Sequence, residues 1–275
     1  MSLFINHNLA SEVAQRSLAG TTRSLSSSFE KVSSGLRINK AADDAAGLGV
    51  AENLEAESRS AKVAMRNTND GISVVQTAEG ATNEVGNIVK RMRELAVQAS
   101  SDSLASTERD YINDEYVQLE AEVDRLAEVT EFNGTLLTNG GNTALNIQVG
   151  VNNTTNDRIQ ITLGDLSGDT LGVDSATIGM SSVASSRAAI TALDSALDTI
   201  NGYRSDYGAT QNRLGSALSS MEVYRENLVS AEAQIRDVDF ASETANMAKN
   251  QIMQQAGLSV LAQAKVQGQG VLSLL

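Results

Sequence analysis

The sequence predicts a mainly α-helical protein: a long antiparallel helical coiled coil or bundle that forms a rod, with a small β-hairpin region in the middle of the chain. Three observations predict this class. Apolar residues recur every three or four positions in both halves of the 275-residue chain. Proline is absent, so no proline interrupts a long helix. Only 3% of the residues are aromatic, which is little material for a globular core.

The strongest pattern is a seven-residue repeat near the C-terminal end. Its first series consists of Leu193, Ile200, Tyr207, Leu214, Met221, Leu228 and Ile235. A second series lies three residues later, at Ala196, Tyr203, Thr210, Ala217, Tyr224, Ala231 and Val238. Thirteen of these fourteen positions are apolar, and their alternation is that of a coiled-coil a/d seam. We therefore expect one continuous helix over about 185–238, buried along this seam.

The N-terminal half supplies helices that can pack against this seam. One stripe runs through Val74, Ala78, Ala81, Val85, Ile88, Met92, Leu95 and Ala99, and a shorter one through Ile112, Tyr116, Leu119, Val123 and Leu126. Segment 100–107, SSDSLAST, separates the two predicted helices, with Ser106 placed to cap the second. The simplest interpretation of every stripe is bundle core.

The middle of the chain has the composition of turns and strands. Asn133-Gly134 and Asn139-Gly140-Gly141 are turn sequences. Two runs of alternating apolar residues, at 145–151 and 159–163, flank a polar turn at 152–157 and predict a β-hairpin over about 144–166. The following segment, 164–183, has the composition of a loop.

The two ends of the chain carry apolar stripes without an obvious cover. Near the start the stripe comprises Leu18, Thr22, Leu25, Phe29, Val32 and Leu36, with Gly35 close to the end of the helix. At the other end it comprises Met253, Gly257, Leu261, Ala264, Gly268, Val271 and Leu275, and residues 241–275 contain only three charged side chains. A single helix cannot bury its own apolar stripe, so we expect other molecules to cover this end.

Composition excludes most chemistry. Cysteine is absent and His7 is the only histidine, so thiolate sites and sites with two His ligands are excluded. A net charge of −13 opposes nucleic-acid binding, and no apolar run reaches the length of a membrane helix. Asp43 and Asp44 are adjacent and do not converge on a helix, which favours a loop or helix-start role. We expect no enzymatic activity, no metal and no cofactor.

Several segments in one order then identify a family. Residues 26–81, which include KVSSGLRINKAADDAAGLGV, resemble the N-terminal region of bacterial flagellins. So do VKRMRELAVQAS at 89–100 and EVTEFNGTLL at 128–137. Residues 213–275, ending in AQAKVQGQGVLSLL, are similar to the flagellin C-terminus. The resemblance covers about three quarters of the chain, and it is that of a short flagellin without the outer variable domains.

The resemblance implies a domain organisation. An inner-core helix in 1–40 pairs with a second one in 236–275, and the rod comprises 41–184, including the hairpin, and the long helix 185–235. Within the two terminal stripes, the residues that we expect to serve filament assembly are Leu18, Leu25, Phe29, Val32, Leu36, Met253, Leu261, Val271 and Leu275.

The resemblance also implies the function: self-polymerisation into the helical, extracellular filament of the bacterial flagellum, for swimming. The subunit would be exported through the flagellar type III channel without a cleavable signal peptide. Its expected partners are copies of itself, the flagellar cap and hook-junction proteins, and an export chaperone at the C-terminal segment. A minor flagellin or a hook–filament junction subunit stays open as an alternative.

A further implied partner is the vertebrate Toll-like receptor that senses flagellin. The receptor-binding segment of the family, Arg-x-Arg-Glu-Leu, is matched at 91–95, and a glutamate of the following helix falls on Glu115. Arg91, Leu95 and Glu115 are therefore the expected receptor contacts. Leu95 also lies on the predicted core stripe, so a purely structural role for it stays open.

Overall fold

The computed structural model describes residues 8–175 and 178–272, of which 267–272 are described by their backbone alone. His7, Leu275 and the side chain of Val271 lie outside the described part. The helices are α1 (Leu9–Ser34), α2 (Ala45–Ala99), α3 (Ser106–Val129), α4 (Gly168–Leu171), α5 (Val183–Arg236) and α6 (Phe240–Leu272). The strands are β1 (Glu131–Phe132), β2 (Thr135–Leu136), β3 (Ala144–Gln148) and β4 (Arg158–Thr162), with a 3-10 turn at Thr155–Asp157. The mainly α class with a small β region is confirmed.

The chain divides into two units. The terminal unit comprises Met1–Ser58 and Glu226–Leu275, and the central unit comprises Arg59–Arg225. The boundaries between units fall inside α2 and α5, whereas the expected boundaries at 40 and 236 fall at the breaks between helices.

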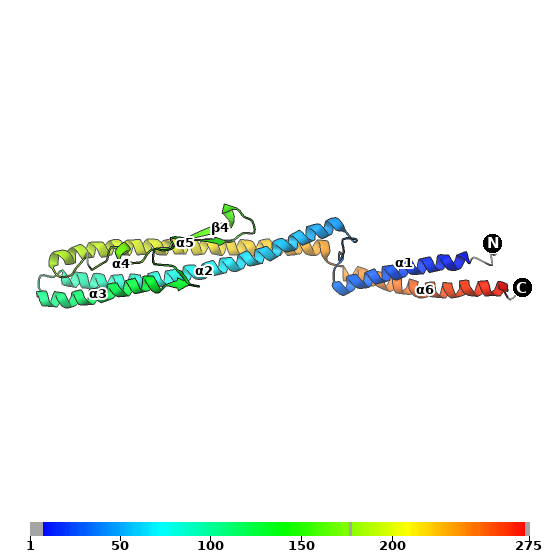
Figure 1. Cartoon of the computed structure of the whole chain (residues 1–275), viewed down its shortest axis with the longest axis horizontal. Helices are drawn as coiled ribbons and strands as arrows, with labels where there is room; N and C mark the ends of the chain where they lie inside the picture. Colours follow the sequence, from blue (N-terminus) through cyan, green and yellow to red (C-terminus); the bar gives the residue numbers. More distant parts are fainter. Residues whose placement is uncertain (1–7, 176–177, 273–275) are drawn as a thin grey trace. The chain divides into compact units, whose positions relative to one another are not determined.

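In the central unit, α2, α3 and α5 run side by side (Figure 1). Contacts between distant positions fix their directions. Arg93 of α2 binds Asp194 of α5 at 2.6 Å, and Gln211 of α5 donates to Glu79 of α2 at 2.8 Å. Because the numbers rise on one helix as they fall on the other, α2 and α5 are antiparallel.

The heptad seam of α5 lies in the core along most of the central unit. Leu193, Ile200, Tyr207 and Leu214 are at most 2% exposed. Met221 and Ile235 are half-buried, Leu228 is buried, and Tyr224 in the second series is 38% exposed. The helix ends at Arg236, two residues before the expected end, because the Arg37 N–H donates to the Arg236 carbonyl. Val238 therefore lies outside the helix.

The break between α2 and α3 falls at 100–105, but Ser106 does not cap α3. The N-cap is Ala105, and Ser106 is the first residue of the helix. The Glu108 carboxylate accepts a hydrogen bond from the Ala105 N–H at 2.9 Å. This is one of the two hydrogen bonds of a capping box, and it does not require a polar side chain at the N-cap residue. The expectation that Ser106 caps α3 was wrong, because the helix begins at Ser106 itself and the Glu108 side chain satisfies the backbone N–H of the N-cap residue.

Two antiparallel hairpins follow α3. Asn133 and Gly134 have φ values of 50° and 76° between β1 and β2, as a two-residue type I′ turn requires. In the second hairpin Leu145 pairs with Ile161 and Ile147 with Ile159. At its end, the Gly164 N–H donates to the Tyr207 hydroxyl at 3.0 Å. The ring of Tyr203 leaves no room for a side chain on Gly164.

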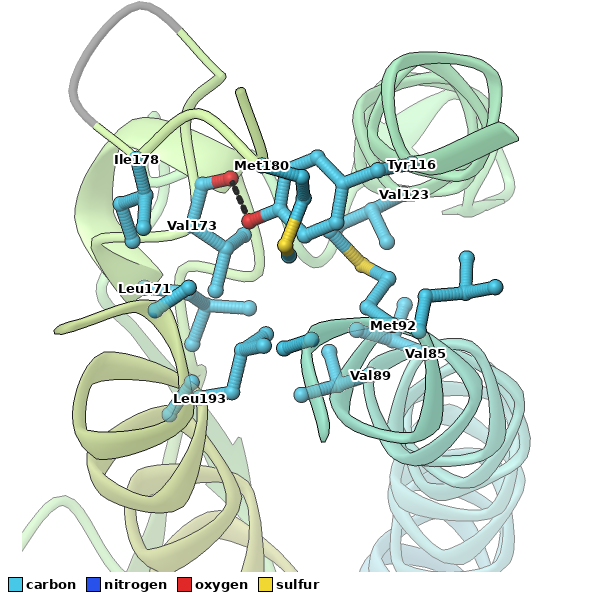
Figure 2. Close-up of a cluster of buried hydrophobic side chains, with 14 of the residues drawn as sticks. Val85, Val89, Met92, Tyr116, Val123, Leu171, Val173, Ile178, Met180 and Leu193 are labelled. Carbon is cyan, nitrogen blue, oxygen red and sulfur yellow. Dashed lines mark hydrogen bonds between the residues drawn. The ribbon is translucent and has the colours of Figure 1, made fainter. Parts of the chain in front are cut away.

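Segment 164–183 is not the simple loop that its composition predicted. It forms the short helix α4, and its apolar residues Leu166, Leu171, Val173, Ile178 and Met180 are buried. They complete a hydrophobic cluster with Val85, Val89, Met92, Tyr116, Val123 and Leu193 (Figure 2). The Tyr116 hydroxyl donates to the Val173 carbonyl at 2.7 Å, which ties this segment to α3.

Candidate assembly surfaces

In the terminal unit, α1 and α6 pack along one narrow face of each helix (Figure 1). The residues of α1 on this face are Ser11, Ala14, Leu18, Thr21, Leu25, Ser28 and Val32, and those of α6 are Glu243, Met247, Asn250, Gln254, Gly257, Leu261 and Ala264. Both sets have heptad spacing, and all members are buried or half-buried. Most of these side chains are small or polar, so the pair buries little apolar area on its own.

Small residues bring the two backbones close together. A Cβ on Gly257 would lie 3.3 Å from the Leu18 Cδ1 atom. The Asn8 side chain donates to the Ala264 carbonyl at 2.9 Å, and the same side chain caps α1 by accepting from the Ser11 N–H. These contacts set the register of the pair.

The N-terminal apolar stripe divides between two faces of α1. Leu18, Leu25 and Val32 lie against α6, but Thr22 and Phe29 are exposed, Phe29 at 64%. Their seam positions are taken by Thr21 and Ser28, one residue earlier, which are buried. Sequence reasoning missed these two residues, although their heptad spacing with Leu18 and Leu25 is a signal that could have found them.

The C-terminal stripe divides in the same way. Met253 is 46% exposed, and Gln254 occupies its seam position. Leu261 is half-buried on the seam, and Leu36 is half-buried beyond the end of α1.

Large apolar side chains on α6 remain exposed on the faces that α1 does not cover. Ile252 and Val266 are 67% and 64% exposed, and Leu258 and Val260 are 52% and 54% exposed. At about 100° per residue, Ile252 lies roughly 200° from the seam position Gln254, and Leu258 and Val260 lie on opposite flanks. A helix that is apolar on all sides is normally buried on all sides. Three faces of α6 thus lack a cover within the described residues of this chain.

A compact set of contacts joins the two connectors of the terminal unit. Gly35 ends α1 with a φ of 75°, and Leu36 pairs with Asp237 in a single antiparallel bridge. The Arg37 guanidinium donates to the last-turn carbonyl of Ile235. The guanidinium of Arg236, whose side chain is 19% exposed, lies 3.0 Å from Glu55. The start of α2, the end of α5 and both connectors are held together by these groups.

Asp43 and Asp44 have the helix-start role that the sequence favoured. Asp43 accepts hydrogen bonds from the backbone N–H groups of Asn39 and Lys40, and these bonds lower the pKa of its carboxyl group. Asp44 accepts from the Gly47 N–H at 2.9 Å, at the first turn of α2. Neither carboxylate is arranged for catalysis.

Of the three expected receptor contacts, two are accessible. Arg91 of α2 donates to Glu115 of α3 at 2.9 and 3.1 Å, and to Glu94 at 3.0 Å. These hydrogen bonds, that to Glu115 first, raise the pKa of Arg91. Arg91 and Glu115 are exposed, but Leu95 is 2% exposed and lies in the hydrophobic cluster of Figure 2. A partner could therefore reach the ion pair without moving the core, but not Leu95.

Within the described ranges, no three His, Asp or Glu side chains are grouped as a metal site would require. Over the same residues, no helix combines the length and apolar character needed to span a membrane.

Comparison with known families decides the identity. The model of the bacterial flagellin N-terminal helical region matches residues 5–143, and that of the bacterial flagellin C-terminal helical region matches residues 190–275. The chain belongs to the bacterial flagellin family. Flagellins are structural proteins of the flagellar filament, so this chain is a structural subunit and not an enzyme.

Relatives and solved structures agree with this assignment. A flagellin from Halalkalibacterium halodurans is 40% identical over 273 residues, which cover 99% of this chain and all of the relative. The flagellar filament 33 kDa core protein of Treponema phagedenis is also 40% identical, over 287 residues, with the same coverage of both chains. The crystal structure of Bacillus cereus flagellin matches 57% of this chain and 88% of its own, with a TM-score of 0.50 and 32% identity. The chain thus has the length of a short flagellin without a variable domain.

Proposed function

We propose that the chain polymerises through its terminal unit into the helical, extracellular filament of the bacterial flagellum, and that the filament serves swimming. The observation that carries this proposal is the exposure of Ile252, Leu258, Val260 and Val266 on the uncovered faces of α6. Copies of the same chain can cover these faces, because each copy brings the same apolar helices. Contacts of this kind that do not close on themselves give a filament.

The energy available from this burial is substantial. Complete burial of one large aliphatic side chain contributes about 1.5–3 kcal/mol. The four side chains of α6 are 52–67% exposed, so burying the rest of them represents roughly 4–7 kcal/mol per subunit before the cost of association is subtracted. Most α1–α6 seam positions are small or polar, so we expect the order of the terminal unit to depend on this additional burial in the assembly.

Several partners follow from this function. The exposed C-terminal helix would need an export chaperone before assembly, and the ends of the filament would contact the cap and hook-junction proteins. Export through the flagellar type III channel requires an unfolded chain. The absence of proline and cysteine suits this route, because refolding then involves no prolyl isomerisation or disulfide formation.

Deletion of residues 241–275 tests the proposal. We expect the truncated chain to lose seeded polymerisation, while circular dichroism still reports the helices of the central unit. The full chain, seeded with filament fragments, is the positive control. Filaments of normal length from the truncated chain would refute the terminal unit as the assembly element.

A second candidate function is recognition by the flagellin-sensing Toll-like receptor. The supporting observation is that Arg91 and Glu115 form an exposed ion pair between α2 and α3. We expect Arg91→Ala to weaken signalling in receptor reporter cells, because arginine is a frequent interface hot spot. Arg125→Ala on α3, which removes another exposed ion-paired arginine, is the control. Equal signalling from Arg91→Ala and the unchanged chain would reject this function.

A further inference from the structure

We propose that central units associate head to tail, with a basic cleft beside the second hairpin of one copy binding an acidic aromatic patch on α3 of the next copy. This inference rests on the proposed polymerisation and names a second contact between subunits. The basic cleft is the hollow lined by β4, its preceding turn and α5. The acidic patch is defined as Asp110, Tyr111 and Asp114.

The basic cleft has a volume of about 610 Å³. Its polar lining consists of Thr155, Asn156 and Arg158 from the hairpin and of Asn212, Arg213 and Ser216 from α5. No carboxylate is among the residues that line it. In a chain of net charge −13, a cleft with two guanidinium groups and no acid is a distinctive feature.

The two arginines differ in their hydrogen-bond partners within the chain. The Arg158 guanidinium donates to the neutral side chains of Gln148 and Asn153. Arg213 is exposed and forms no hydrogen bond or ion pair with any residue that the structure describes. The adjacent acid Asp157 does not line the cleft and accepts a hydrogen bond from Thr154. Both positive charges therefore lack a carboxylate partner and are available to an acidic group.

The acidic patch has the complementary chemistry. Tyr111 is 72% exposed, the most exposed of the large hydrophobic side chains in the described part of the chain. Asp110 and Asp114, one helical turn apart, flank it, and both are exposed. Neither makes an ion pair within the described residues, whereas Glu115 and Glu122 on the same helix each pair with an arginine. Tyrosine and arginine are the residue types that dominate interface energies, and a guanidinium binds both a carboxylate and an aromatic face.

The two surfaces cannot meet within one molecule. Arg213 lies close to Gln211, which contacts Glu79 of α2, whereas Asp114 lies next to Glu115, which contacts Arg91 of α2. Glu79 and Arg91 are separated by roughly 20 Å along α2, so the two surfaces lie about that far apart along the rod. Every copy of the chain carries both surfaces, so a second copy can supply the complementary one. Because the two surfaces are different, the contact is heterologous and can repeat without closing.

A charge exchange between two variants of the full-length chain tests this contact. We expect Arg213→Glu alone, and Asp114→Lys alone, to raise the critical concentration for seeded polymerisation by about tenfold, because each opposes like charges. An equimolar mixture of the two variants should polymerise at close to the unchanged concentration. In the mixture the two variants can alternate along the assembly. At one contact the carboxylate introduced at position 213 faces the ammonium introduced at position 114, and at the next contact the unchanged Arg213 faces the unchanged Asp114.

The control is Arg204→Glu, which makes the same charge change nine residues earlier on α5 and thus on the opposite side of the helix. Circular dichroism and melting of all variants should match the unchanged chain. Normal polymerisation of Arg213→Glu, or a mixture no better than the single variants, would overturn the contact. Failure of the unchanged chain itself to polymerise on seeds would instead overturn the proposed function on which the contact rests.

Discussion

Replacement of Leu214 by alanine is the sharpest test of the coiled-coil seam. Leu214 is 0% exposed and lies in the cluster that joins α2, the second hairpin and α5. Truncation of a leucine at such a site removes its transfer free energy and leaves a cavity, which together cost about 2–5 kcal/mol. For a unit of this size, each 1 kcal/mol lowers the melting temperature by about 2–4 °C. For a loss of about 3.5 kcal/mol, the middle of that range, we therefore expect the melting temperature to decrease by roughly 7–14 °C.

The assay is thermal unfolding followed by the helical circular dichroism signal. Val223→Ala, on the same helix but at a position that is 57% exposed, is the matched control and should change stability by less than about 0.5 kcal/mol. Similar melting temperatures for the two variants would refute the assignment of Leu214 to a buried seam.

Four further predictions address other contacts. Gly257→Val should weaken seeded assembly without changing the helix content of the central unit, because its side chain would crowd Leu18, whose Cδ1 atom lies only 3.3 Å from the position of the first added carbon. Filaments of normal length and number in electron micrographs would contradict this prediction. Tyr116→Phe should lower stability by about 1–3 kcal/mol in denaturant titrations at neutral pH, because the buried Val173 carbonyl loses its donor. Burial raises the pKa of Tyr116, so the unchanged chain should lose stability as the pH rises above about 10, where the unfolded phenol ionises first; a Tyr116→Phe variant with an equally steep loss would show that this phenol is not responsible. Arg93→Ala removes a solvent-exposed ion pair with Asp194 and should leave the denaturation midpoint nearly unchanged, so a clear decrease in that midpoint would mean that this pair holds α2 and α5 together.

The periodic elements could be predicted from the sequence because their signals are local and repeated. The heptads of α5 located a helix whose observed bounds differ from the expected ones by two residues at each end. Asn133-Gly134 located the first hairpin turn, since only a few residue types accept two positive φ values in succession.

The remaining features depend on tertiary contacts. The buried residues of 164–183 have no regular period, because the segment follows the surface that α2, α3 and α5 present instead of forming a long helix or strand. In α1, the choice between Thr21 and Thr22 as the seam residue depends on where α6 lies. Small polar residues at a close helix contact do not appear in an apolar pattern, so the sequence favoured Phe29 over Ser28.

The same limitation applies to the candidate assembly surfaces. The sequence indicated that residues 241–275 need a cover, but it could not show that the large apolar residues of α6 face away from α1. The basic cleft also joins Arg158 to Arg213, which are far apart in the sequence. A pattern read along the chain has no means of bringing such residues together.

Amide hydrogen exchange, measured on the isolated chain and on the seeded filament, tests most directly whether the terminal unit is completed by other copies. We expect the amides of α1 and α6 to exchange rapidly in the isolated chain and to become protected by several orders of magnitude in the filament, while the amides of α5 in the central unit change little. Strong protection of α6 in the isolated chain, with no further gain in the filament, would contradict the account.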